Sequence, residues 1–248
     1  MTGVDRAATS VLPGPAAPNR SAGAAHRPDP RPARFVAEAL GTARTVLNVG
    51  AAARGTGPSA PAAPSRPSRT VPSVDTVAGE LPFHDGEFDA AMTLLNIHLW
   101  DDVRLGLREM RRVTRGPILV LTRDPARVGD FWLHEYAPEV VAAEARRYPP
   151  LDELTAALGG RSTVRPVPIP FDCTDGLDEA CYGRPDLLLD PNARRVDWTW
   201  SSVGDSVRER FNRTLRADLA SGAWDRRFGH LRTRPQYEGA LVLVRATP

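Results

Sequence analysis

The sequence predicts an α/β fold built around a mostly parallel sheet. Short apolar runs rich in β-branched residues recur along the chain, as expected for strands that are buried on both faces. Segments with apolar residues at helical spacing separate these runs. Strands that alternate with helices favour a parallel sheet, because each helix carries the chain back to the edge at which the previous strand began.

The first half of the chain supplies four predicted strands. A helix begins near Pro32 and ends at Gly41, and the run 45–49 (TVLNV) then enters a turn at Gly50. Residues 51–73 hold five prolines and many small residues, so we predict a loop inside the domain. The strands that follow are predicted at 74–78, 88–95 and 118–122, with an amphipathic helix over 102–114.

The second half is predicted to be mainly helical. Residues 164–169 form a strand that its two prolines confine to the edge of the sheet, and 240–245 (ALVLVR) is the last strand. Helices are predicted over roughly 135–147, over 151–158 and through much of 173–236, where Asp190–Pro191 and a Ser206–Glu209 capping box mark helix starts.

Composition excludes several functions before any motif is considered. All 32 basic residues are Arg, so catalysis through a Schiff-base, Walker-A or kinase lysine is excluded. Residues 1–31 are rich in Pro and Ala and have no apolar period, so we predict a disordered tail there and a single domain over 32–248. Residues 1–72 hold nine Arg and three acidic residues, whereas the rest is net acidic, which argues against a nucleic-acid-binding core.

Metal and membrane functions are also disfavoured. The only cysteines are Cys173 and Cys181, too few for a zinc site, and no H-x-E, H-E-x-x-H or C-x-x-C pattern occurs. We therefore expect no metal. No uncharged apolar run approaches the roughly 18 residues of a membrane span, and the N-terminus has no apolar signal region. The sequence therefore predicts a cytoplasmic protein with neither membrane nor nucleic-acid partners.

Three sequence blocks resemble the class I S-adenosylmethionine-dependent methyltransferases of the small type 11 group. They are VLNVGAAARG, GELPFHDGEFDAAMTLLNIHLW and LREMRRVTRGPILVLTRDP, in the order and spacing of that family. The resemblance covers about residues 34–125 and extends less specifically to the end of the chain. It implies a Rossmann-like methyltransferase fold with helices on both faces and an antiparallel last strand, in which 240–245 lies beside 164–169.

The resemblance also implies where the cofactor, S-adenosylmethionine, binds. Asn48 matches the acidic residue that precedes the family's glycine-rich turn, and Gly50 matches the first glycine. Ala52 and Arg54 stand where the other two glycines would be. The remaining cofactor positions are Gly79, Glu80 and Leu81, in the loop beside the adenine, and Leu95 and Asn96, at the strand end beneath the cofactor.

One element of the family has no counterpart in the predicted map. The family holds the ribose hydroxyls with a carboxylate at the end of its second strand, because a carboxylate accepts two hydrogen bonds at once. No Asp or Glu occurs between Glu38 and Asp75, and we predict that the proline-rich loop takes the place of that strand. Losing hydrogen bonds to a charged group costs roughly 1.5–3 kcal/mol each.

His98 is the candidate catalytic residue. It follows a predicted strand in an H-x-W context and would act as a general base, because imidazole titrates near neutral pH. It could equally pack against Trp100. Aromatic side chains that would line a pocket for a small-molecule acceptor, or simply pack between helices, are Tyr136, Tyr148, Tyr182, Trp198, Trp200 and Trp224.

Two functions remain open from the sequence. The leading hypothesis is methyl transfer from S-adenosylmethionine to a small molecule, catalysed by a methyltransferase. The second is a methyltransferase-fold protein that no longer methylates and serves as a binding or partner subunit, or runs a cofactor-free reaction. The altered glycine turn and the missing carboxylate favour the second. An NAD(P)-dependent enzyme is disfavoured, because G-x-G-x-x-G is absent.

Overall fold

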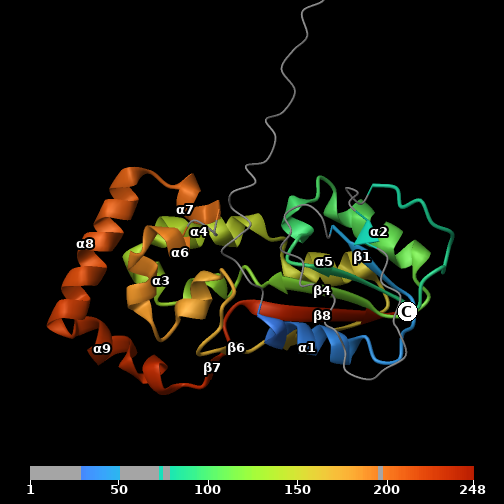
Figure 1. Ribbon diagram of the computed structural model, residues 1–248. Helices are drawn as coiled ribbons and strands as arrows, with labels where there is room; N and C mark the ends of the chain where they lie inside the picture. Colours follow the sequence, from blue (N-terminus) through green and yellow to red (C-terminus); the bar gives the residue numbers. More distant parts are fainter. Residues whose placement is uncertain (1–28, 51–72, 75–78, 195–197) are drawn as a thin grey trace, which may run out of the picture.

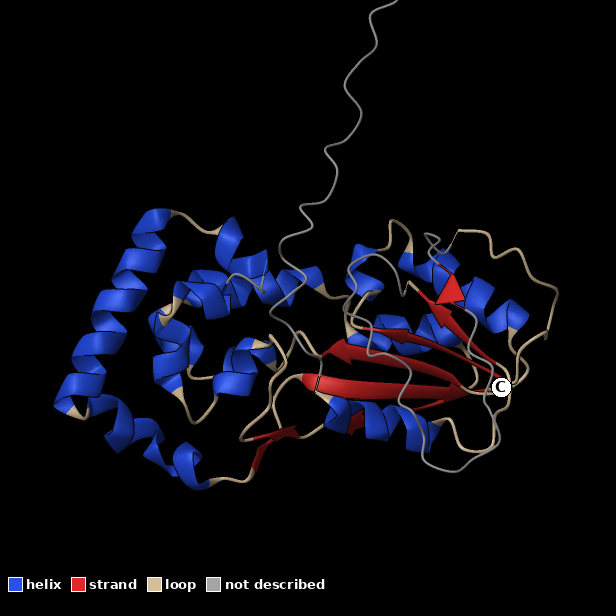
Figure 2. Ribbon diagram, in the orientation of Figure 1, coloured by secondary structure: helices blue, strands red, loops and turns tan. Residues whose placement is uncertain are grey.

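The computed structural model describes residues 29–50, 73–74, 79–194 and 198–248. It has two lobes, which Figures 1 and 2 show side by side. The sheet lobe contains the main β-sheet and the helices packed on it. The helical lobe contains two helices from the middle of the chain together with residues 171–238. The two lobes meet where the parallel strands end.

The main sheet has six strands in the order β2-β1-β3-β4-β8-β5. The first four run parallel: β1 (Val46–Val49), β2 (Ser73–Val74), β3 (Ala90–Leu94) and β4 (Ile118–Arg123). The last strand, β8 (Leu241–Thr247), runs antiparallel between β4 and β5 (Arg161–Pro166). This confirms the predicted fold class, including the antiparallel last strand and the edge position of the proline-containing strand.

The second strand corrects one expectation. Ser73 and Val74 pair in parallel with Asn48 and Val49, so a strand does stand where the family has its second strand. The prediction that the proline-rich loop takes its place is therefore wrong. The strand predicted at 74–78 overlaps it only at Val74, since 75–78 lie outside the described residues.

Helices cover both faces of the sheet, as the resemblance implied. On one face α2 (Val103–Val113) and α5 (Leu151–Leu158) bury Leu107, Met110 and Leu154 against Leu47 and Ile118. On the other face α1 (Pro30–Ala39) buries Val36 and Leu40 against β1, β3 and β4. Because side chains alternate along a strand, each parallel strand contributes to both cores. Helix α1 begins at Pro30, so residues 30 and 31, which were assigned to the tail, are helical.

The helical lobe is formed by α3 (Leu133–Tyr136), α4 (Pro138–Arg147), α6 (Pro191–Arg194), α7 (Trp198–Ser202), α8 (Asp205–Ser221) and α9 (Ala223–Phe228). Its ends are tied by a small sheet of β6 (Ile169–Pro170) and β7 (Gln236–Tyr237). The helix predicted over 135–147 is two helices, broken at Ala137 before Pro138. The predicted Ser206–Glu209 capping box is wrong, because α8 begins at Asp205 and is preceded by Gly204. The helix start predicted at Asp190–Pro191 is confirmed, since α6 begins at Pro191 and Asp190 accepts a hydrogen bond from the N–H of Asn192.

Candidate functional site

The parallel strands end at one edge of the sheet, which we call the carboxyl edge; it comprises Gly50 after β1, Leu95 after β3 and Asp124 after β4. Ligands of open parallel sheets bind at this edge. The helical lobe lies beyond this edge and faces it, with α3, α4, α6 and α7 (Figure 1).

Gly50 forms a tight turn at the end of β1. Its φ is +82°, a backbone conformation that glycine adopts readily and L side chains avoid. A Cβ at this position would lie 3.2 Å from Cβ of Asn96 and 3.4 Å from Nε1 of Trp100. The turn therefore brings the backbone after β1 close to two polar side chains that follow β3.

Two buried polar atoms, one on β1 two residues before Gly50 and one beside the turn, have no hydrogen-bond partner among the described residues. They are Oδ1 of Asn48 and Nε1 of Trp100, although buried polar groups are normally paired. Asn48 is 6% exposed and Trp100 is 9% exposed. One atom accepts hydrogen bonds and the other donates them. We did not predict Trp100 as a ligand; an indole N–H on a strand-end loop was the available signal.

The other predicted cofactor residues fall into two groups. Asn96 is 5% exposed beside Gly50, and Leu95 directly precedes it with a φ of +55°. Leu95 is the one non-glycine residue with positive φ in the described part of the chain, and such strain is concentrated at functional sites. Glu80 and Gly79 lie in an exposed turn, Leu81 is 2% exposed, and Ala52 lies outside the described residues.

Leu81 is held by its backbone as well as by its side chain. Its N–H donates to Glu109 (3.0 Å) and its carbonyl accepts from Arg112 (3.0 Å), and the same two side chains pair with each other. The E-M-R-R-V helix of the sequence motif thus fixes the loop that the resemblance places beside the adenine.

His98 lies in η2 (Ile97–Leu99), directly after Asn96. Its Nε2 is 2.7 Å from Nη2 of Arg147, and because a guanidinium only donates, Nε2 is the acceptor. The imidazole also packs edge-on against Tyr148, with ring centroids 4.8 Å apart. A general base needs a free lone pair, so this geometry fits a positioned side chain better than the predicted base.

Arg147 belongs to a buried ion network that joins the lobes. It pairs with Glu144 (2.9 Å), Glu144 pairs with Arg123 (2.8 Å), and Arg123 pairs with Glu179 (2.9 Å). Arg123 ends β4, whereas Glu144 is in α4 and Glu179 is in η4 (Asp178–Cys181). Burial by itself raises the pKa of Glu144, but the charges of Arg123 and Arg147 outweigh burial and hold that pKa below its ordinary value.

The aromatic residues predicted for an acceptor pocket are mostly core. Tyr136, Tyr182, Trp200 and Trp224 are at most 4% exposed and belong to one hydrophobic cluster of the helical lobe. Tyr148 is buried against α2 and α5. This supports the packing alternative for these five; the side chain of Trp198 lies outside the described ones.

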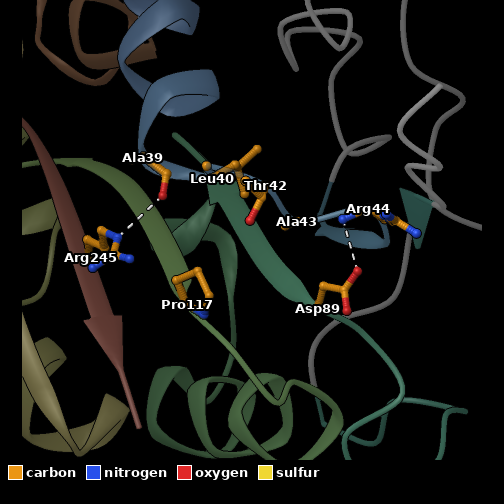
Figure 3. A pocket seen from close by; sticks show the side chains of 9 residues that line it. Ala39, Leu40, Thr42, Ala43, Arg44, Asp89, Pro117 and Arg245 are labelled. Atoms are coloured by element: carbon orange, nitrogen blue, oxygen red, sulfur yellow. Dashed lines mark hydrogen bonds between the residues drawn. The ribbon is translucent and has the colours of Figure 1, made fainter. Parts of the chain in front are cut away.

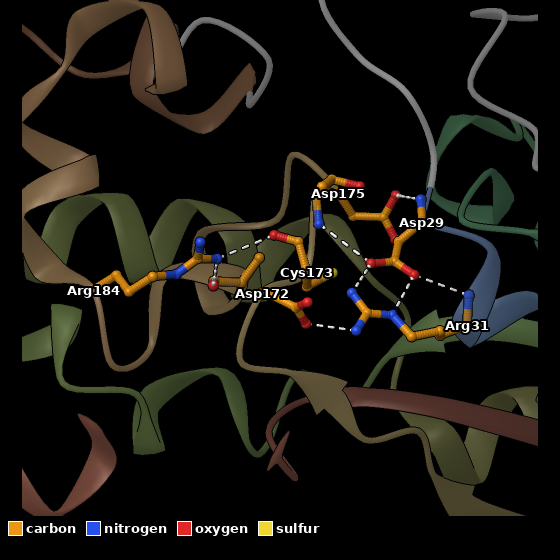
Figure 4. A network of polar contacts seen from close by, with 8 residues as sticks. Asp29, Arg31, Asp172, Cys173, Asp175 and Arg184 are labelled. Atoms are coloured by element: carbon orange, nitrogen blue, oxygen red, sulfur yellow. Dashed lines mark hydrogen bonds and ion pairs between the residues drawn. The ribbon is translucent and has the colours of Figure 1, made fainter. Parts of the chain in front are cut away.

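A second polar network ties the start of α1 to the helical lobe (Figure 4). The buried carboxylate of Asp29 accepts from Arg31 (2.5–2.9 Å) and from the N–H of Thr174 (3.3 Å), and Arg31 also pairs with Asp172. The Arg31 side chain holds the pKa of Asp29 well below its usual range. Burial raises the pKa of the neighbouring Cys173 thiol to about 12, as expected of an inert thiol.

A pocket of about 440 Å³ lies at the opposite edge of the sheet (Figure 3). Leu40, Arg44, Asp89, Pro117 and Arg245 line it, and Arg44, Asp89 and Pro117 all precede strands. It is therefore separate from the carboxyl edge. Among the described residues, no cluster of three His, Cys, Asp or Glu could hold a metal ion, and no helix has the length and apolarity to cross a membrane.

Comparisons with known proteins agree with this fold. Residues 41–117 match the family model of the methyltransferase domain. A protein of Anabaena variabilis assigned as a methyltransferase of an antibiotic biosynthesis pathway is 24% identical, with a TM-score of 0.76 over 89% of this chain and 98% of that one. The YcgJ protein of Bacillus subtilis is 16% identical, with a TM-score of 0.46 over 87% and 97%. No curated protein matches the chain.

The domain match and the shared fold confirm the resemblance seen in the sequence. Residues 41–117 match a methyltransferase domain, and the chain has the Rossmann-like fold of the class I methyltransferases. The cofactor of this class of domain is S-adenosylmethionine, and the described residues fit its amino-acid end. Asn48 presents a buried acceptor of the kind an ammonium needs, and Trp100 presents a buried donor of the kind a carboxylate needs.

Proposed function

We propose that this protein transfers a methyl group from S-adenosylmethionine to a small molecule. The observation that carries the proposal is the unpartnered pair, Asn48 Oδ1 and Trp100 Nε1, beside the Gly50 turn. Buried polar atoms without partners destabilise the free protein. They are accounted for if a ligand with one donor end and one acceptor end completes them.

The chain's own contribution is to bind and orient. The bound cofactor supplies an electrophilic methyl group. Asn48 accepts a hydrogen bond from the ammonium, Trp100 donates one to the carboxylate, and Gly50 leaves room for both. Transfer to many acceptors needs in-line positioning more than acid or base catalysis. We therefore assign His98 to positioning, held by Arg147, rather than to proton removal.

The ribose contact has a candidate by sequence position. Asp75 is the first residue after β2, the position at which the family carries its ribose carboxylate. Its placement lies outside the described residues, so this assignment rests on the strand register alone. Asp75→Asn should weaken S-adenosylhomocysteine at least about tenfold, the value of one charged hydrogen bond. An unchanged affinity would rule out Asp75 as the ribose ligand.

A small acceptor is favoured by the arrangement of the lobes. The helical lobe faces the carboxyl edge, and the ion network of Arg123, Glu144 and Glu179 fastens it there. A macromolecular acceptor would have to reach the methyl group past this lobe. The assay is transfer of labelled methyl groups from S-adenosylmethionine to fractionated small-molecule extracts, with boiled protein as the control.

Calorimetric titration tests the cofactor site directly. We expect the wild type to bind S-adenosylhomocysteine, and Trp100→Phe to bind it at least about tenfold more weakly, because a charge-assisted hydrogen bond is lost. The matched ligand is 5′-methylthioadenosine, which lacks the amino-acid end and should bind both proteins equally. No binding of S-adenosylmethionine or its product to the wild type would refute methyl transfer and favour a protein that has lost it.

Asn48→Asp gives an independent test with the opposite sign. It restores the negative charge found at this position in the family, so affinity for the ammonium-bearing ligands should rise. Affinity for 5′-methylthioadenosine should stay the same. If Asn48→Asp weakens S-adenosylhomocysteine, Asn48 does not face the ammonium.

A further inference from the structure

Arg194 is a buried cation without a partner. It ends α6, is 5% exposed, and its Nη1 is buried without a hydrogen bond. Within the described part of the chain, none of its nitrogens makes a hydrogen bond or an ion pair. Its guanidinium instead lies over two aromatic rings, 4.9 Å from the centroid of Trp200 and 5.4 Å from that of Phe211.

Other guanidiniums inside the protein make ion pairs or hydrogen bonds with described residues. Arg123 pairs with Glu144 and Glu179, and Arg111 donates to the carbonyls of Leu158, Gly116 and Ala246. Burying a charge is unfavourable unless it is paired, and ring contacts replace only part of its hydration. Burial lowers the pKa of Arg194, partly offset by the charge of Asp178. The fold therefore buries a guanidinium that makes no ion pair with the described residues.

Arg194 is connected to the carboxyl edge by a short series of contacts. Trp200, beneath its guanidinium, donates from Nε1 to both carboxylate oxygens of Asp178 at 3.0 Å. The next residue, Glu179, pairs with Arg123 at the end of β4. Helices α6 and α7, which carry Arg194 and Trp200, lie between α8 and the sheet (Figure 1).

We propose that Arg194 recognises a carboxylate on the methyl acceptor, which makes it a specificity-determining residue. This rests on the proposed function. A planar guanidinium can bind a planar carboxylate through two parallel hydrogen bonds, and the contacts with Trp200 and Phe211 restrict where this one can lie. A phosphate dianion fits less well, because it carries a second negative charge and Asp178 lies close enough to act electrostatically on Arg194.

The test uses benzoate as the probe, with benzamide as its uncharged match and inorganic phosphate as the alternative anion. Arg194→Met keeps the stem that packs on the rings and removes the charge. Arg213→Met, at an exposed position on α8, removes the same charge elsewhere and is the control. Binding is followed by ligand-observed NMR on the full-length protein.

We expect benzoate to bind the wild type and Arg213→Met alike, and Arg194→Met at least about tenfold more weakly. Benzamide should bind weakly and equally to all three. Equal benzoate affinity in the wild type and Arg194→Met, or no saturable benzoate binding to the wild type, overturns the proposal. Tighter binding of phosphate than of benzoate overturns the choice of carboxylate.

Thermal unfolding without ligand is the second readout. Because Arg194 makes no hydrogen bond or ion pair with the described residues, and Met keeps an apolar stem against the two rings, Arg194→Met should unfold at the same temperature as the wild type or higher. A marked fall would show that Arg194 is structural and would overturn the proposal. Titration with S-adenosylhomocysteine distinguishes a failure of the Arg194 proposal from a failure of the proposed methyl transfer. We expect the wild type and Arg194→Met to bind S-adenosylhomocysteine equally. If the wild type does not bind it, methyl transfer is refuted, whereas benzoate binding at Arg194 is not.

Discussion

Arg123→Met should be among the most destabilising single substitutions in this protein. Arg123 is 3% exposed and bridges Glu144 at 2.8 Å and Glu179 at 2.9 Å. After its removal Glu144 keeps Arg147, whereas Glu179, which is fully buried, keeps among the described residues only the N–H of Ala240 (2.8 Å). Breaking a buried pair from one side costs about 3–5 kcal/mol, because a charge is left uncompensated. For a chain of this length that is roughly 6–20 °C in melting temperature.

The assay is urea unfolding of the wild type and Arg123→Met, followed by circular dichroism. Arg104→Met is the control, since Arg104 pairs with Glu153 at 3.6 Å and both side chains are more than half exposed. Such a surface pair contributes about 0–1 kcal/mol. Adding Glu179→Gln to Arg123→Met should recover part of the loss by removing the stranded charge. If Arg123→Met costs no more than Arg104→Met, the ion network does not hold the lobes together.

Three further substitutions test the site and the sheet. Gly50→Ala should destabilise the protein by roughly 1–3 kcal/mol and weaken the binding of S-adenosylhomocysteine, because φ is +82° and the new methyl group meets Asn96. The control is Gly129→Ala, which has open space around it and should leave the melting temperature nearly unchanged. His98→Gln can still accept from Arg147, so turnover should fall less than about tenfold, and a loss of about 10²–10⁴ would restore His98 as a base. The backbone N–H of Thr45, then Arg115, hold the pKa of Asp89 below its usual range, so its stabilising effect is full above about pH 4 and is lost as the pH falls further. The difference in unfolding free energy between wild type and Asp89→Asn should therefore shrink on acidification, and a constant difference would contradict the assignment.

The strands could be predicted because they are continuous apolar runs. Residues 90–94 and 118–123 have no polar periodicity, and burial on both faces demands that pattern. Strand β2 was displaced in the prediction because its two described residues, Ser73 and Val74, carry no such signal and are placed by pairing with β1. The capping box predicted at Ser206 is wrong because the helix begins one residue earlier, at Asp205, directly after Gly204.

The site was predictable only where the main chain defines it. Gly50 and Asn96 follow strands, so their position could be inferred from the strand order. Trp100 and Arg194 could not be found this way, because their significance lies in the absence of a partner, and a sequence does not show which side chains meet. The contact between Arg147 and His98 joins residues that are 49 positions apart in the chain, so the sequence does not reveal it either.

Stability and function are linked in this molecule through Glu144. One of its oxygens pairs with Arg123 at the carboxyl edge, and the other pairs with Arg147, which in turn donates to His98 two residues after Asn96. A change at Arg123 therefore alters the partner that orients His98, although Arg123 itself need not contact either substrate. In contrast, Asn48 and Trp100, which we propose to bind the cofactor, lie on β1 and after β3, outside these ion pairs. We accordingly expect Arg123→Met, under conditions where it remains folded, to lower turnover more than it lowers affinity for S-adenosylhomocysteine. Equal losses in both would mean that the ion network also supports the turn at Gly50, and would contradict this separation.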